Sequence, residues 1–121
     1  RDALRAVELT HDILDLPDGV QTRLTPSGRP LAPGQAARLM LARAIAGQPR
    51  LLILDDALDD LNEPGLRERI VEMLFDRDAP WTLVCVTRSP DLLARCDRVI
   101  QPRGARLTEA PGGRSWPEEG R

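Results

Sequence analysis

Apolar residues recur at two spacings along the chain, and the order of these spacings predicts an α/β fold. Helical spacing appears in residues 3–16, in residues 34–46 and in a segment that begins at Asn62-Glu63-Pro64. The stripe of the first helix is Leu4, Val7, His11 and Leu14, and that of the third is Leu66, Ile70, Met73 and Leu74. Pro33 suits the first turn of the second helix, and Gly47 suits its end.

Strand-like segments alternate with these helices. Leu51 to Leu54 and Trp81 to Thr87 are apolar without polar alternation, so both faces of each strand are expected to be covered, as in a parallel sheet. A short helix is expected from Ser89 to about Arg95. Two short strands, 98–101 and 105–108, are expected to join at Pro102-Arg103-Gly104. This order predicts a right-handed α/β layout with a mainly parallel sheet.

The 121 residues suffice for one domain with one core. We expect the domain to span residues 1–110, with a helical part at 1–47 and the strands at 48–110. Residues 111–121 are rich in Gly and Pro and are expected to form a flexible tail.

Charge and composition narrow the possible functions. The net charge is −2, which argues against a general nucleic-acid binder. No apolar run is long enough to span a bilayer and no signal peptide is visible, so we expect any membrane partner to lie outside this chain. Cys85 and Cys96 lack metal-ligand spacing and are interpreted as small buried hydrophobes in a reducing cytosol.

Two carboxylates mark a candidate site. Asp55 and Asp56 end the strand of residues 51–54, and open α/β sheets hold ligands at the carboxyl ends of strands. Where the substrate carries phosphate, such an Asp is normally a Mg²⁺ partner. All 17 basic residues are Arg, so the chain cannot contain the Gly-x-x-x-x-Gly-Lys-Ser/Thr loop that cradles phosphates. At most half of a nucleotide site is therefore expected.

The stretch 31–56 resembles the ATP-binding cassette (ABC) ATPases. Leu31-Ala32-Pro33-Gly34-Gln35 stands where the family has its Leu-Ser-Gly-Gly-Gln signature, and residues 51–55 resemble its Walker B strand. Arg38, residues 41–44 and Pro49 fall at family spacing. The resemblance covers roughly residues 3–110 and implies a partial P-loop NTPase core with part of the helical signature subdomain, from that subdomain through the H-loop to the closing strands.

The segment of residues 8–31 resembles exporters rather than importers, because His11, Leu16, Pro17 and Gly19 stand at exporter-type places. In exporters, a loop before the signature touches the transmembrane domain. The resemblance assigns residues 22–28 to that loop. It implies a place on the cytoplasmic side of the cell membrane, such as a bacterial inner membrane.

The resemblance also implies ATP and Mg²⁺ as cofactors and a second nucleotide-binding domain as partner, paired head to tail. The signature residues Leu31, Ala32, Pro33, Gly34 and Gln35 would then cap ATP on the partner's P-loop. Ala32 lacks the signature hydroxyl, and Pro33 lacks a backbone N–H. The simpler alternative is that Pro33-Gly34 only begins a helix.

The remaining site residues also follow from the resemblance. Asp55 would hold Mg²⁺ through water, and Asp56 stands where the family has a catalytic Glu. Its carboxylate falls short by on the order of an ångström, so Asp56 is either a weakened base or no longer catalytic. Arg88 replaces the switch His and either binds phosphate or pairs with a nearby carboxylate. The D-loop would be Asp59, Asp60, Leu61 and Asn62, although Asn62 could instead cap a helix.

Four positions therefore depart from the family pattern together: Ala32, Pro33, Asp56 and Arg88. The expected function is that of the C-terminal part of an exporter's ATP-binding domain, with slow hydrolysis. The main alternative is a catalytically dead interaction module. A soluble ABC ATPase of DNA repair or translation is disfavoured by the charge and by the exporter-like segment.

The family's Walker A strand lies between the strands that correspond to residues 81–87 and 98–101, and it has no counterpart here. Those two strands would lose their shared neighbour, which leaves backbone groups unpaired. We therefore expect the chain to be part of a longer transporter subunit and, alone, to be partly structured, rearranged or paired with a second chain.

Overall fold

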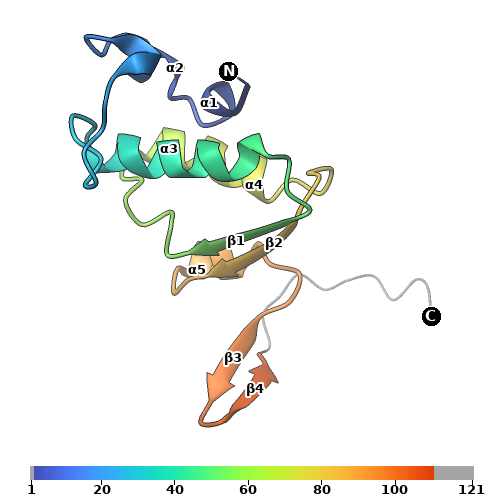
Figure 1. Cartoon of the computed structure of the whole chain (residues 1–121). Helices are drawn as coiled ribbons and strands as arrows, with labels where there is room; N and C mark the ends of the chain where they lie inside the picture. Colours follow the sequence, from blue (N-terminus) through green and yellow to red (C-terminus); the bar gives the residue numbers. More distant parts are fainter. Residues whose placement is uncertain (1, 111–121) are drawn as a thin grey trace. The chain divides into compact units, whose positions relative to one another are not determined.

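The computed structural model describes residues 2–110, so the predicted tail at 111–121 lies outside the described residues. The chain divides into two compact units, with the boundary between Cys85 and Val86. Helices and strands alternate in the order expected for a mixed α/β chain (Figure 1).

The first unit opens with two short helices, α1 (Asp2–Ala6) and α2 (Thr10–Leu14), followed by the 3₁₀ turn η1 (Gly19–Gln21). The prediction of one continuous helix over residues 3–16 is wrong. The chain breaks at Glu8, whose φ of 53° lies in the left-handed region and cannot continue a right-handed helix. Val7 and Leu9 are both fully buried. Residues two apart point to different sides of a helix, so the break lets both side chains enter the core while Leu14 stays 61% exposed.

Helix α3 (Pro33–Ala46) confirms the second predicted helix. Ala32 precedes it in an extended conformation, Pro33 occupies its first turn, and Gly47 ends it. Its buried residues are Arg38, Leu41, Ala42 and Ile45. The helix packs against α1.

Helix α4 (Pro64–Leu74) confirms the third. It buries Leu66, Ile70, Val71 and Leu74, while Met73 is half-buried. Its last carbonyl, that of Leu74, accepts a hydrogen bond from the Trp81 indole Nε1–H at 3.1 Å. This bond fixes the connection from α4 to the strand that follows.

Strands β1 (Leu51–Asp55) and β2 (Thr82–Val86) form a two-stranded sheet, and Figure 1 draws their arrows in the same direction. The Thr82 N–H donates to the Arg50 carbonyl at 2.8 Å. Figure 1 also draws α3 and α4 on one side of this pair.

Burial alternates along β1, so the prediction that both faces would be covered is wrong in this structure. Leu52 and Leu54 are 3% and 4% exposed, whereas Leu51 and Ile53 are 54% and 62% exposed. Val84 of β2 is also 45% exposed. The strand sequence is apolar on both faces, but the core supplied by the first unit lies against only one of them.

The second unit holds α5 (Pro90–Leu93) and the antiparallel hairpin of β3 (Ile100–Arg103) and β4 (Arg106–Glu109). The predicted turn lies two residues further along, because Pro102 sits within β3 opposite Leu107. Gly104 makes the turn with φ 60°. Arg98 pairs with Glu109 at 3.2 Å. As described, β2 and β3 belong to different sheets and share no neighbouring strand.

Candidate functional site

The segment predicted as the signature, residues 31–35, forms the entry to α3. Leu31 is 6% exposed and anchors the segment in the core. Ala32 is the N-cap residue, with φ −67° and ψ 157°, and its N–H donates to Gln35 Oε1 at 2.9 Å. This is one half of the usual reciprocal cap, since Ala32 has no side-chain oxygen to return the bond. Gln35 therefore folds back over the start of its own helix.

The other end of Gln35 is held by α2. Its Nε2 donates to Asp12 Oδ1 at 2.7 Å. The second Asp12 oxygen, Oδ2, pairs with an Arg38 terminal nitrogen at 3.0 Å, and the other Arg38 terminal nitrogen donates to the Glu8 carbonyl at 2.6 Å. Arg38 is only 7% exposed, and a buried guanidinium needs such partners.

Glu8 extends this cluster to α4. Its carboxylate receives the Arg69 guanidinium in a two-point contact, with distances of 2.5 and 2.8 Å. The hydrogen bond from Arg69 lowers the pKa of the Glu8 carboxyl. Sequence reasoning missed Asp12, Glu8 and Arg69, because contacts between segments up to 61 residues apart leave no local pattern.

The start of α3 lies against the segment predicted as the D-loop. A Cβ placed on Gly34 would stand 3.2 Å from the Asp60 carbonyl oxygen, which is tighter than ordinary contact. A residue with a side chain would press on this backbone. The structure thus brings together Gly34 and Asp60, two residues that the family resemblance assigns to separate motifs.

The two carboxylates predicted at the end of β1 are open to solvent. Asp55 is the last residue of the strand, and Asp56 follows with φ 48°. The Asp59 N–H donates to the Asp56 carbonyl at 3.2 Å, which closes a turn. Exposed carboxylate oxygens are suitable ligands for Mg²⁺, directly or through water. Residues 2–110 contain no group of three or more His, Cys, Asp or Glu side chains arranged to hold a metal ion.

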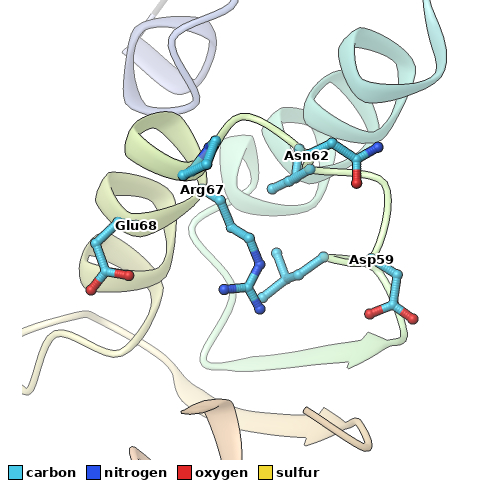
Figure 2. Close-up of a pocket in the computed structure, with 7 residues that line it drawn as sticks. Asp59, Asn62, Arg67 and Glu68 are labelled. Atoms are coloured by element: carbon cyan, nitrogen blue, oxygen red, sulfur yellow. The ribbon is translucent and has the colours of Figure 1, made fainter. Parts of the chain in front are cut away.

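A shallow pocket of about 470 Å³ opens beside the D-loop segment (Figure 2). It is lined by Leu58, Asp59, Leu61, Asn62, Pro64, Arg67 and Glu68. Figure 2 shows Arg67 reaching from α4 across the pocket, with Asp59 and Asn62 on the loop opposite. Leu58 and Leu61 are 2% and 4% exposed, so the loop is anchored by its apolar residues and presents its polar ones.

The structure decides one alternative left open by the sequence. Glu63, not Asn62, is the N-cap residue of α4, and the cap has no side-chain hydrogen bond. Asn62 is exposed. Helix capping therefore does not explain this residue.

Arg88 follows β2 and belongs to the second unit. Its side chain is exposed, and within the described part of the chain no ion pair of Arg88 is present. The alternative of a structural pair with a neighbouring carboxylate is thus not supported. In the described residues Cys85 and Cys96 form no disulfide and both are half-buried, and burial raises the pKa of the Cys96 thiol.

Comparison with known proteins identifies relatives across nearly the whole chain. A multidrug efflux ATP-binding/permease protein of Mycobacterium bovis is 40% identical over 110 residues, which are 88% of this chain and 9% of that protein. An ATP-dependent lipid A-core flippase of Burkholderia thailandensis is 31% identical over 121 residues, which are 98% of this chain and 20% of the flippase. The heterocyst differentiation ATP-binding protein HepA of Nostoc is 30% identical over 112 residues, covering 90% and 18% of the two chains.

No protein-family model matches the chain. The chain spans from about a tenth to a fifth of the length of these relatives. None of the helices in residues 2–110 combines the length and the apolar character that a membrane crossing requires. The match along 88–98% of the chain, together with the mixed α/β fold, places it in the ABC transporter family as part of an ATP-binding domain.

Proposed function

We propose that this chain is the C-terminal part of the ATP-binding domain of an ABC exporter and that residues 31–35 close over an ATP held on the P-loop of a second domain. The observation that carries the proposal is the close approach of Gly34 to Asp60. It brings the signature segment and the D-loop segment to one place, and both would have to face the same nucleotide.

The proposed division follows the sequence. Residues 1–47 supply the helical signature part, and residues 48–110 run from the Walker B strand to the closing strands. Asp59, Asp60, Leu61 and Asn62 form the D-loop. The exposed polar side chains of Asp59 and Asn62 on this anchored loop are available to a partner domain.

Asp55 and Asp56 would act on the Mg²⁺ and water side of the site. Asp55 would hold the ion through water, which lets the ion neutralise charge that develops on the phosphates. Asp56 would orient and partly deprotonate the attacking water, with a shorter reach than the usual Glu. Arg88 would bind phosphate oxygens, but it cannot exchange a proton near neutral pH.

Hydrolysis should be slow because both the segment that caps the nucleotide and the position that activates water are weakened. The capping segment offers neither a hydroxyl at Ala32 nor an N–H at Pro33. The water-activating position offers only the shorter Asp56. A partner with normal residues would meet one weakened element at each of the two composite sites.

The proposed partners are a second nucleotide-binding domain and a transmembrane domain, contacted through residues 22–28. This arrangement would place the chain on the cytoplasmic side of the membrane. No nucleic-acid partner is proposed.

The test measures Mg-ATP binding and phosphate release by the full-length gene product. Asp56→Glu should raise the rate of phosphate release at least about tenfold, because a correctly placed base is worth about 10²–10⁴ in rate. Asp18→Glu adds the same methylene at an exposed position and should change nothing.

A second candidate function is a cassette-like module that docks without turnover. The concurrent loss at Ala32, Pro33, Asp56 and Arg88 favours it. Tight ATP binding with no phosphate release, unrescued by Asp56→Glu combined with Arg88→His, would establish the module. Absence of any ATP-dependent association would overturn both functions.

A further inference from the structure

Asp12 lies outside the segments proposed to touch the nucleotide or a partner, yet its side chain directly contacts Gln35 of the segment 31–35. Asp12 comes from α2, and its two oxygens bind two residues of α3. Oδ1 accepts from Gln35 at 2.7 Å, and Oδ2 pairs with Arg38 at 3.0 Å. The Asp12 side chain is 30% exposed and the Arg38 side chain 8% exposed, so the pair is largely shielded from water.

The Gln35 side chain links Asp12 to the backbone at Ala32. Its amide nitrogen is bound to Asp12, and its amide oxygen accepts the Ala32 N–H at 2.9 Å. An amide group has one orientation that satisfies both contacts, because its oxygen accepts and its nitrogen donates. Asp12 therefore selects the orientation in which Gln35 can hold Ala32.

We propose that Asp12 is a positioning residue that, through Gln35, fixes the backbone at Ala32 and Pro33 in the conformation that meets the nucleotide. The assignment of a nucleotide role to this backbone rests on the proposed function. The structural part of the inference, that Asp12 orders Ala32, does not depend on it.

Because Ala32 lacks the family's hydroxyl, the start of α3 depends more on the contact between Asp12 and Gln35. A side-chain hydroxyl at position 32 could hold the helix start by bonding to a backbone N–H. Ala32 cannot do so, and no side-chain cap bond is formed. The bond from the Ala32 N–H to Gln35 is the contact that remains between the N-cap residue and a side chain of the first turn.

The experiment follows solvent exchange of the Ala32 amide by NMR in the full chain. Asp12→Ala should speed this exchange by about tenfold, the size expected for loss of one hydrogen bond. The Ala36 N–H, which donates to the Ala32 carbonyl at 2.9 Å, reports whether the helix start as a whole has loosened. Asp15→Ala removes a nearby exposed carboxylate of the same type and should leave Ala32 unchanged.

A purely structural role is separated by repeating Asp12→Ala in a Gln35→Ala background. If Asp12 acts through Gln35, its removal there has no further effect on Ala32 exchange. If Asp12 only stabilises the fold, exchange rises equally in both backgrounds and the proposal is overturned.

Asp12→Ala leaves Arg38 buried without its carboxylate, which could unfold the chain. A second comparison avoids this by setting Arg38→Met against Arg38→Met with Asp12→Leu, since apolar residues often replace a buried pair without loss. Faster Ala32 exchange only in the double variant supports the proposal, and equal exchange contradicts it.

The functional arm uses ATP-dependent association with a P-loop-containing ATP-binding domain. We expect Asp12→Ala to weaken this association several-fold while Asp15→Ala does not. If the wild-type chain shows no such association, the proposed function fails while the Ala32 exchange still decides the positioning role. If the wild type associates and Asp12→Ala associates equally well, the positioning role in nucleotide capture is wrong.

Discussion

Two glycines occupy the same place in their helices but meet different surroundings. Pro33-Gly34 begins α3, and Pro64-Gly65 begins α4. A Cβ on Gly34 would meet the Asp60 backbone oxygen at 3.2 Å, whereas one on Gly65 would meet only the far end of Arg69 at 3.4 Å. A flexible side chain can move aside, but a backbone carbonyl in an anchored loop cannot do so freely.

Alanine substitutions at Gly34 and Gly65 should therefore change the free energy of unfolding by different amounts. Gly65→Ala should raise the free energy of unfolding by up to about 1 kcal/mol, because Ala is the better helix former. Gly34→Ala should fall short of this gain by about 1 kcal/mol or more, since the backbone at Asp60 must shift. Denaturant unfolding of both variants measures the difference, and equal gains would show that Gly34 and Asp60 are not in close approach.

The contact of Glu8 with Arg69 makes a pH-dependent contribution. The Arg69 hydrogen bond holds the pKa of Glu8 below its usual value in the folded chain. As the pH falls, the unfolded state takes up this proton first. The contribution is complete above the ordinary carboxylate pKa and is lost as the pH falls through the folded pKa, from about pH 5 downward.

Glu8→Gln should therefore destabilise the chain at pH 7, and the effect should be smaller at pH 3. The effect should be small and should shrink in 1 M salt, because both side chains are about half exposed. Asp18→Asn removes a carboxylate that is exposed at the surface and serves as the control. A Glu8→Gln effect that is equal at pH 7 and pH 3 would show that the ion pair does not stabilise the fold.

At this scale, the sequence predicts residues 31–35 and 55–62 as site segments because their order and spacing are local. It could not supply Asp12, whose role depends on contacts with Gln35 and Arg38, 23 and 26 positions away. The chemical roles of Asp55, Asp56 and Arg88 remain predictions that the ATP experiments test.

Among the elements, the β1–β2 pair departs most from expectation. Its apolar sequence predicts burial on both faces, but the first unit covers only the face that carries Leu52 and Leu54. Leu51, Ile53 and Val84 remain exposed. An apolar strand sequence indicates that both faces can be buried, and the layers actually present decide whether they are.

Alanine substitutions on the two faces of β1 should differ. Leu54→Ala should lower the free energy of unfolding by about 2–5 kcal/mol, whereas Ile53→Ala should cost less than about 1 kcal/mol. Thermal or denaturant unfolding of the two variants provides the comparison. Similar large losses would mean that both faces are covered in solution, as the sequence alone predicted.

Helix α3 and helix α4 were predictable to within a residue at their starts, because Pro33 and Pro64 mark a first turn. The break at Glu8 was not. A helical stripe and a broken pair of short helices can share the same apolar residues, and the demand to bury both Val7 and Leu9 decides between them.

At the scale of the whole molecule, the main feature is the division of the strands into two separate sheets. The sequence predicts that β2 and β3 lack a shared neighbour, and in the described residues they lie in two separate two-stranded sheets. The β3–β4 hairpin pairs over four residues on each strand, and nearly all of these side chains are exposed. Two-stranded hairpins with so little buried surface are marginally stable.

Hydrogen-exchange rates should therefore differ between the hairpin and the core of the first unit. Backbone amides in the β3–β4 ladder should exchange at least about a hundredfold faster than those in the buried middle of α3, because the hairpin opens locally without unfolding the core. Exchange measured residue by residue by NMR provides the comparison. Equal protection in the hairpin and in α3 would show that one cooperative unit includes both.

The Trp81 indole, whose N–H donates to the Leu74 carbonyl, is a fluorescent probe of the region around it. The chain contains two tryptophans and no tyrosine, and the other tryptophan is Trp116. In a Trp116→Phe background, ultraviolet emission would come from Trp81 alone, at the point where α4 leads into β2. Water that reaches this ring shifts its emission to longer wavelengths. A shift of the emission maximum therefore reports loosening of the segment that joins α4 to β2.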